Sequence, residues 1–328
     1  MTIIDELSWY KECFERSYPK YLTGRKPEAH YRIMLELIGR GGKRLRPILC
    51  MLSARLAGGD VKHAIPLAVA LEFFHNFTLI HDDIEDDSTL RRGKPTMHRI
   101  YGVPLAINAG DGLYALSYEI ILGCKALFGI ERSWKILAAF NRMNVALVEG
   151  QAMDINFRSN HEMDEAEVLE LLRKKTGALF ATSAYCGAIA GGGDEELASD
   201  LALMWEKVGI SFQVQDDILN LTGEEEKYGK RIGDDVSEGK PTLILIHALK
   251  NASESDRELI MEALNRPYDE KKVRDVIRIF EDTGAIEYAR AVADSYLRDA
   301  LLIAEKLPES KEQDQMIRLA RYVLEREV

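Results

Sequence analysis

One stretch of the chain, residues 67–95, constrains the fold more than any other. Residues 67–92 contain neither proline nor glycine, which predicts one long helix over most of the stretch. Apolar residues occupy nearly every helical face before His81, and this predicts burial on all sides. From Asp82 the sequence becomes acidic, and two arginines follow before a Gly-Lys-Pro break. Such a helix would carry its carboxylates out of the core to the mouth of a cavity.

Two acidic sites suggest metal binding. Asp82 and Asp86 lie four residues apart, so they would share one helix face, where like charges repel unless a cation lies between them. Mg²⁺ suits such a face, because it takes one or two carboxylates and completes its shell with water and substrate phosphates. The alternative is a solvated acidic helix end. A second site, with Asp216 and Asn220 again four residues apart, favours the metal.

Composition and charge exclude some classes of protein. The 328 residues carry 43 Lys and Arg against 54 Asp and Glu, a formal net charge of −11. This argues against a nucleic-acid partner, which would need a basic face. The four cysteines are far apart without a C-x-x-C pair, as is typical of free thiols in a reducing cytoplasm. The first residues lack the features of a signal peptide, and we expect a cytoplasmic protein with no transmembrane segment.

The periodicity of apolar residues predicts the fold class. They recur with the 3.6-residue helical period almost throughout, and strand-like alternation is almost absent, so we expect an all-α fold. Long helices are expected over 103–127, 133–157, 164–190, 195–221 and 284–305. No repeat is present, which favours one domain over residues 1–328. The polar segment 222–242 is either a lid or a solvated connection.

Basic residues form local clusters beside glycine or proline inside this acidic chain. The clusters are Lys43 with Arg46, Arg91 with Arg92, Lys174 with Lys175, and Lys230 with Lys240. Arginine suits phosphate, which it binds through two parallel hydrogen bonds. His75 lies about two helical turns before Asp82 and could also reach a phosphate. Mg²⁺ ions held by the two acidic sites would then neutralise the charge of a leaving diphosphate.

Six ordered blocks resemble the trans-polyprenyl diphosphate synthases over nearly the full length of the chain. They are GGKRLRP (41–47), DDIED followed by LRRGKPT (82–96), EGQAMD (149–154), KTGALF (175–180), FQVQDDILN (212–220) and GKRIGDDVSEGK (229–240). The resemblance implies an isoprenoid synthase fold, a single large bundle of long antiparallel helices around a deep central cavity. It also implies two or three Mg²⁺ ions, isopentenyl diphosphate and allylic diphosphates as substrates, and a homodimer.

The resemblance also implies roles for single residues. The metal ligands would be Asp82, Asp86 and Asp216, supported by Asp83 and Asp217, and these three ligands with Lys175 and Lys230 form the implied catalytic set. Isopentenyl diphosphate would be bound by Lys43, Arg46, His75 and Arg92. The allylic diphosphate would be bound by Arg91, Lys175, Thr176, Gln213, Lys230 and Lys240. One departure is Asn220, where many members carry Asp. An amide adds no charge, so Asn220 is not counted as a ligand, and Asp235 is a candidate outer-shell group.

The implied reaction is a head-to-tail prenyl transfer that gives a short-chain trans-polyprenyl diphosphate. Phe74, Thr78 and Asp82 are spaced by four, which places Thr78 about 6 Å and Phe74 about 12 Å from Asp82 along a helix. Phe77 before the small Thr78, with no insertion in DDIED, resembles archaeal-type geranylgeranyl diphosphate synthases. The implied product is geranylgeranyl diphosphate, its length limited by Phe77, Thr78 and Phe74. A farnesyl or longer-chain synthase is the alternative.

Three other classes fit the sequence less well. A ferritin-like metal protein needs two Glu-x-x-His pairs, and the chain has only Glu72 with His75. A regulatory prenyl synthase subunit would be expected to lose one acidic motif, whereas both are essentially intact here. Terpene cyclases share the fold but usually lack the GGKRLRP and paired-arginine blocks.

Overall fold

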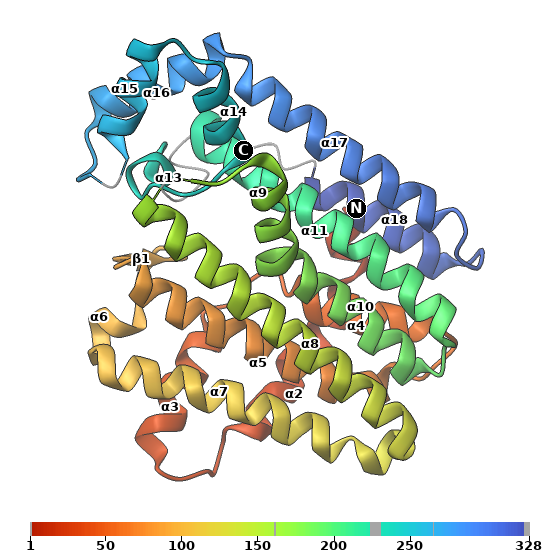
Figure 1. Cartoon of the computed structure of the whole chain (residues 1–328). Helices are drawn as coiled ribbons and strands as arrows, with labels where there is room; N and C mark the ends of the chain where they lie inside the picture. The colour runs from red at the N-terminus through yellow and green to blue at the C-terminus, as the bar shows by residue number, and fades with distance from the viewer. Residues whose placement is uncertain (1, 161, 224–230, 265, 325–328) are drawn as a thin grey trace. The chain divides into compact units, whose positions relative to one another are not determined.

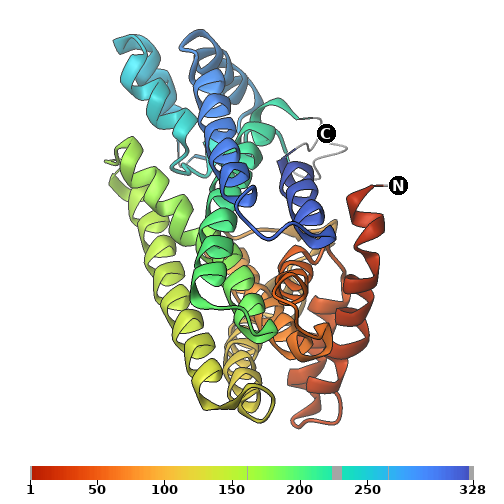
Figure 2. The same cartoon turned by 90° about the vertical axis from the view of Figure 1, so that its right-hand side faces the viewer.

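The computed structural model describes residues 2–160, 162–223, 231–264 and 266–324. Within these ranges almost all regular structure is helical (Figures 1 and 2). The chain divides into two compact units. The first comprises Met1–Arg142, Leu179–Ala202 and Lys306–Leu319, and the second comprises Met143–Ala178, Leu203–Glu305 and Ala320–Val328. The expected all-α fold class is confirmed, while a single domain over residues 1–328 stays a prediction.

Helices build the first unit. In chain order they are α1 (Ile3–Glu6), α2 (Ser8–Ser17), a 3-10 turn (Tyr18–Tyr21), α3 (Glu28–Gly39), α4 (Leu45–Leu56), α5 (Val61–Glu85), α6 (Met97–Tyr101) and α7 (Val103–Gly123). The unit also holds the start of α8 (Lys125–Asn160) and most of α10 (Ala178–Gly191) and α18 (Lys311–Leu324). The long helix α5 packs against both α4 and α7 (Figure 1).

Helix α5 is the expected long helix, and it ends before Arg92. It begins at Val61, where the Asp60 carboxylate accepts a hydrogen bond from the Lys62 N–H. It ends at Glu85, so the expectation of one helix over most of residues 67–92 is confirmed. Asp86 is the cap residue, and Asp87 has φ +49°, a left-handed conformation that stops the helix. Most residues before His81 are buried, as expected.

A short hairpin follows α5. Strand β1 (Leu90–Arg91) pairs antiparallel with β2 (Lys94–Pro95), and Arg91 lies opposite Lys94. The two turn residues between them, Arg92 and Gly93, both have positive φ (+54° and +70°), as tight hairpin turns require. The hairpin therefore places Arg91 on a strand and Arg92 in the turn.

Small residues let α10 lie directly on α4. A Cβ on Gly187 would lie 2.1 Å from the Cys50 carbonyl oxygen, and one on Gly191 would lie 2.2 Å from that of Ala54. Glycine at these two positions is therefore needed for the close backbone contact. This explains the uncharged, small-residue composition of the sequence around α10.

By length and composition, Val61–Glu85 is the one helix of the described ranges that could cross a membrane by itself. Of its most apolar window, 61% is buried inside the protein, as for a core helix. Val103–Gly123 and Lys125–Arg158 pass the same test only when taken together, and they are bent by 108° at the break between them.

The second unit contains the later part of α8 and the remaining helices of the described ranges. They are α9 (Glu165–Leu172), a π-helical turn (Arg173–Gly177), most of α11 (Glu195–Thr222), α13 (Asp234–Ser237), α14 (Leu243–Asn251), α15 (Glu254–Ala263), α16 (Glu270–Asp282) and α17 (Ala285–Ala304). Helix α14 packs against α9, α16 and α17 around an aliphatic core. The expected loop 222–242 contains α13, and its residues 224–230 lie outside the described residues.

Candidate active site

The C-terminal end of α5 carries two of the predicted metal ligands. Asp82 lies in its last turn and Asp86 is its cap, and the Asp86 N–H donates to the Asp82 carbonyl oxygen at 2.9 Å. The two residues are therefore one turn apart. No basic residue lies in this last turn. Because a helix C-terminus carries partial negative charge, two carboxylates there favour a nearby cation. This donor set fits Mg²⁺.

Asp83, which follows Asp82, has a different partner. Its side chain is buried, and Arg91 Nε donates to its Oδ1 at 2.7 Å. Burial raises the pKa of Asp83, while the Arg91 guanidinium opposes that rise. The hairpin thus places Arg91 at the acidic end of α5, and the supporting role of Asp83 stays a prediction.

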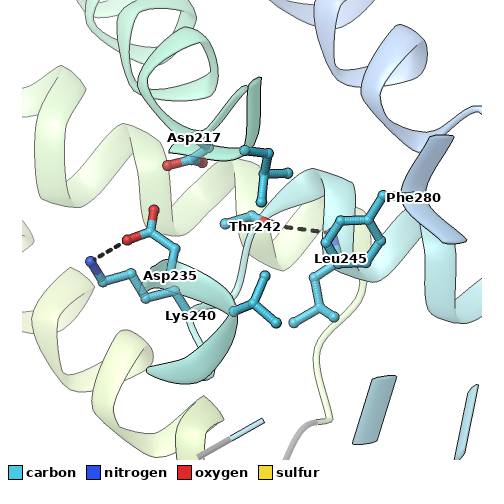
Figure 3. A pocket seen from close by; sticks show the side chains of 8 residues that line it. Asp217, Asp235, Lys240, Thr242, Leu245 and Phe280 are labelled. Atoms are coloured by element: carbon cyan, nitrogen blue, oxygen red, sulfur yellow. Dashed lines mark hydrogen bonds and ion pairs between the residues drawn. The ribbon is translucent and has the colours of Figure 1, made fainter. Parts of the chain in front are cut away.

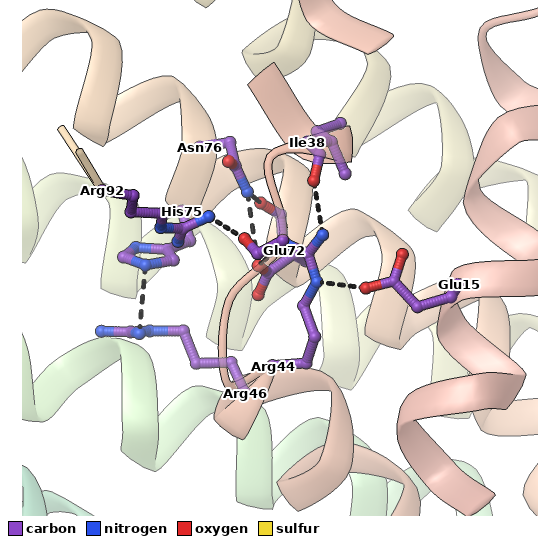
Figure 4. Close-up of polar contacts among 9 residues, drawn as sticks. Glu15, Ile38, Arg44, Arg46, Glu72, His75, Asn76 and Arg92 are labelled. Atoms are coloured by element: carbon purple, nitrogen blue, oxygen red, sulfur yellow. Dashed lines mark hydrogen bonds and ion pairs between the residues drawn. The ribbon is translucent and has the colours of Figure 1, made fainter. Parts of the chain in front are cut away.

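Arg46, His75 and Arg92 form a basic cluster in the first unit (Figure 4). An Arg46 terminal nitrogen lies 3.3 Å from His75 Nε2, and the guanidinium lies over the Phe180 ring at 4.6 Å. Burial lowers the pKa of Arg46 to about 10. Burial, and next the charge of Arg46, hold the pKa of His75 well below its usual value, so this imidazole is neutral at neutral pH. A cluster that contains buried, positively charged guanidinium groups favours the binding of an anion.

The GGKRLRP segment completes this cluster. Arg92 donates to the Gly41 carbonyl oxygen. A Cβ on Gly42, which has φ +143°, would lie 3.0 Å from the Arg92 guanidinium. The positive φ favours glycine here, and a Cβ would require a small shift of the arginine side chain. Lys43, the next residue, is exposed.

The second acidic motif lies on α11 in the second unit. Thr176 Oγ1 donates to Gln213 Oε1 at 2.9 Å, and Gln213 Nε2 donates to Asp217 Oδ1 at 3.1 Å. Three predicted site residues are thus linked by hydrogen bonds. Burial, and next the charge of Asp235, raise the pKa of Asp217 well above its usual value. Asp216 precedes this buried carboxylate on the same helix.

Asp235 and Lys240 lie beside Asp217 in Figure 3. Lys240 Nζ is 2.8 Å from Asp235 Oδ1. These three residues line a cavity of about 10 Å³ together with Leu221, Val236, Thr242, Leu245 and Phe280. Asn220 is fully buried, and its Oδ1 accepts the Asp235 N–H at 3.3 Å. An amide therefore serves here to hold the turn that presents Asp235.

Lys175 lies in the π-helical turn and forms an ion pair with Asp154. Asp154 is buried, and its Oδ2 also lies 3.3 Å from an Arg158 terminal nitrogen. Burial by itself would raise the pKa of Asp154, but the charges of Lys175 and Arg158 lower it. A Cβ on Gly150 would lie 2.9 Å from the Lys175 nitrogen, so α8 approaches this turn closely. Sequence reasoning gave Asp154 no role. Its place in the EGQAMD block was the available signal.

The residues predicted to limit product length lie among aromatic rings of the first unit. Phe77 packs on Phe74 and on Tyr114, with ring centroids 5.3 and 5.2 Å apart. Phe74 is fully buried and also contacts Phe140. The Thr78 hydroxyl donates to the His75 carbonyl oxygen at 2.8 Å. Tyr114 and Phe140 were missed, because no sequence pattern links α7 and α8 to α5.

The structure gathers many of the predicted residues, but their assigned roles stay predictions. Lys230 lies outside the described residues. Within the described ranges, no group of three or more His, Cys, Asp or Glu side chains could hold a metal ion. A metal at either acidic motif would therefore need oxygens from water or from phosphate as further ligands.

Comparison with known proteins settles the family. The family model described as polyprenyl synthetase matches residues 27–281. The chain belongs to this family. It is 39% identical over 327 residues to the short chain isoprenyl diphosphate synthase of Methanothermobacter thermautotrophicus, covering 100% of this chain and 99% of that one. The expectation of a prenyltransferase is thereby confirmed.

Solved structures of geranylgeranyl pyrophosphate synthases share the fold. The Pyrococcus horikoshii enzyme superposes with a TM-score of 0.93 and 34% identity, covering 99% of this chain and 98% of that chain. The Corynebacterium glutamicum enzyme, complexed with isoprenyl diphosphate and magnesium, gives a TM-score of 0.85 at 25% identity, covering 99% and 98%. The isoprenoid synthase fold expected for this family member is confirmed.

Proposed function

We propose that this polyprenyl synthase condenses isopentenyl diphosphate with an allylic diphosphate, head to tail, in an Mg²⁺-dependent reaction. The observation that carries the proposal is on α5. The helix has His75 in a buried basic cluster and, about two turns later, a pair of carboxylates at its C-terminal end. One helix thus offers a place for a phosphate and a place for a cation.

Mg²⁺ would be held by Asp82, Asp86 and Asp216, as two or three ions completed by diphosphate and water oxygens. When bound, the ions would neutralise the leaving diphosphate and so favour cleavage of the allylic carbon–oxygen bond. The absence of any basic residue from the last turn of α5 supports a cation there. The magnesium complex of the Corynebacterium glutamicum enzyme supports the same metal.

The basic residues divide between the two substrates in this proposal. Lys43, Arg46 and Arg92 bind isopentenyl diphosphate, and the neutral His75 supplies a hydrogen bond without adding charge. Arg91, Lys175, Thr176, Gln213, Lys230 and Lys240 bind the allylic diphosphate. Phe74 and Phe77 would keep water from the allylic cation, which would otherwise be quenched. The isopentenyl double bond attacks that cation, and a proton is lost to the departed diphosphate.

Geranylgeranyl diphosphate is the product that the proposal favours. The Pyrococcus horikoshii enzyme, a geranylgeranyl pyrophosphate synthase, is similar over nearly the whole chain. Phe77 beside Phe74 and Tyr114 supplies aromatic bulk one to two turns before the first acidic motif. A farnesyl or longer-chain product is the alternative.

We further propose a cytoplasmic homodimer. Large apolar side chains are exposed on α7 and on the start of α8, among them Leu105 (52%), Leu122 (60%), Ile130 (70%) and Trp134 (68%). A second copy would cover these side chains, because large exposed apolar residues are typical of interfaces. The cysteines of the described chain are free thiols, as expected in a reducing compartment.

One assay tests the reaction. The purified chain is incubated with Mg²⁺, labelled isopentenyl diphosphate and, in separate reactions, dimethylallyl, geranyl or farnesyl diphosphate. We expect labelled products that chromatography identifies as geranylgeranyl diphosphate. If no allylic starter gives a longer labelled diphosphate, the proposed reaction is wrong. Sedimentation of the same sample tests the dimer.

A further inference from the structure

Glu72 is a buried carboxylate that the proposed reaction does not use. It lies on α5, one turn before the basic cluster residue His75, and is 3% exposed. Its Oε1 accepts a hydrogen bond from an Arg44 terminal nitrogen at 2.8 Å. A carboxylate at such a depth needs a compensating charge, and Arg44 supplies it.

Arg44 is held by more than this one contact (Figure 4). Its Nε donates to Glu15 Oε1 at 2.8 Å, and its other terminal nitrogen donates to the Ile38 carbonyl oxygen. The guanidinium also lies over the Phe14 ring, 4.9 Å from its centroid. Arg44 therefore joins α2, α3 and α5 at the segment that precedes α4.

The backbone of Arg44 explains why this matters for its neighbours. Arg44 has φ +54° and ψ +37°, a left-handed conformation that a non-glycine residue adopts only when its surroundings hold it there. It turns the chain between the exposed Lys43 and the helix α4, which carries Arg46. The bonds to Glu72 and Glu15 thus fix the direction in which both of these predicted ligands leave the turn.

The charge of Glu72 also acts on the cluster directly. Burial lowers the pKa values of Arg46 and Arg92, and in both cases Glu72 is the next largest influence and opposes that shift. The Glu72 carboxylate therefore acts on Arg46 and Arg92 as well as on Arg44. Its negative charge partly offsets the repulsion among these guanidinium groups.

We propose that Glu72 is a positioning residue that, through Arg44, holds Lys43, Arg46 and Arg92 in place for the diphosphate of isopentenyl diphosphate. The inference rests on the proposed function, because it takes that substrate as the ligand of this cluster. Glu72 itself touches no substrate in this account. Its effect on catalysis passes entirely through the geometry and charge of its arginine neighbours.

The test compares Glu72→Gln with the wild type and with Glu312→Gln. The control removes another carboxylate of the first unit that pairs with an arginine, Arg55, at 2.8 Å, away from the basic cluster. We expect Glu72→Gln to raise KM for isopentenyl diphosphate about tenfold or more, because the anion site loses its geometry. KM for the allylic substrate and kcat should stay within about threefold. The control should leave all three values near those of the wild type.

Each other outcome has a defined meaning. An unchanged KM for isopentenyl diphosphate, or an equal rise in both KM values, overturns the proposal. If Glu72→Gln does not fold, Arg44→Lys replaces it, since this variant keeps the charge and loses the forked contacts. A selective rise in KM for isopentenyl diphosphate then supports the proposal, and an equal or absent rise overturns it. A wild-type chain without prenyl transfer activity would instead refute the proposed function.

Discussion

The charged phosphate-binding candidates are mostly arginines in the first unit and lysines in the second. Arg46 and Arg92 are both held where burial lowers their pKa values, beside the neutral His75. In the second unit, Lys175 and Lys240 instead form ion pairs with Asp154 and Asp235. The two lysines of the second unit therefore each have an aspartate as a direct partner, whereas Arg46 and Arg92 of the first unit lie beside a neutral histidine.

This difference has a consequence for how each diphosphate binds. An anion that enters the first cluster meets two buried guanidinium groups and offsets the free-energy cost of burying their charge. An anion that enters the second meets aspartates beside the lysines, and added cations would be needed to offset the repulsion. We therefore expect isopentenyl diphosphate to bind without metal and the allylic diphosphate to require Mg²⁺.

Loss of a metal-binding carboxylate should have the largest effect. Asp82→Ala or Asp216→Ala should each lower kcat by about 100-fold or more, because the leaving diphosphate loses its neutralising ions. Circular dichroism should show the helical content of the wild type. Asp275→Ala, on α16, replaces a side chain that is 44% exposed and is the control. Near-normal turnover in either variant would show that the acidic motifs do not act through metal.

Removal of Mg²⁺ tests the comparison directly. With EDTA present, isothermal calorimetry should find that affinity for isopentenyl diphosphate changes less than about threefold. Affinity for a non-reactive thio analogue of the allylic diphosphate should fall about tenfold or more, because uncompensated aspartates repel it. An equal dependence of the two ligands on metal would contradict the contrast between the units.

Arg92→Ala should raise KM for isopentenyl diphosphate by about tenfold or more, and KM for the allylic substrate much less, because only one diphosphate loses a forked donor. Lys240→Ala is the matched variant in the second unit and should show the opposite preference. Steady-state kinetics with each substrate varied in turn gives both values. Equal effects on the two substrates would show that the assigned division is wrong.

The length of the product tests the role proposed for the aromatic residues around Phe77 in the first unit. Phe77→Ser should lengthen the product, because it removes a ring that packs on Phe74 and Tyr114. Thr78→Phe should shorten the product toward farnesyl diphosphate. The control Phe73→Leu alters a buried ring that packs on Tyr21 instead and should leave length unchanged. If chromatography shows the same products for all variants, Phe77 and Thr78 do not line the path of the chain.

The smallest effect concerns protonation of His75. Burial and neighbouring arginines disfavour the imidazolium, so NMR should find its pKa below the ordinary value of 6.5. The free energy of unfolding should therefore decrease as pH falls from 6.5 toward that lowered pKa, because the unfolded chain binds the proton more readily. Arg92→Leu removes a positive neighbour and should raise the His75 pKa. A pKa at or above 6.5 in the wild type would contradict the description of this cluster.

The sequence predicted a large part of this fold for a simple reason. Helical periodicity and helix-stopping residues are local, and the observed α7, α11 and α17 lie close to their expected ranges. The four-residue spacing from Asp82 to Asp86 also needs only the geometry of one helix. The C-terminal end of α5 was harder, because no glycine or proline separates it from Arg92 and the stop comes from the left-handed Asp87.

By itself, the sequence determined the fold class, the family, and the list of acidic and basic residues that would carry the chemistry. Only the tertiary structure decided which of these charges are already paired. Asp154 neutralises Lys175, Asp83 holds Arg91, and Glu72 reaches Arg44 from another helix. The residues of each pair are 21, 8 and 28 positions apart in the chain. Ion pairing and burial depend on distances in space between different helices. Composition and residue spacing along one helix give no information about these distances.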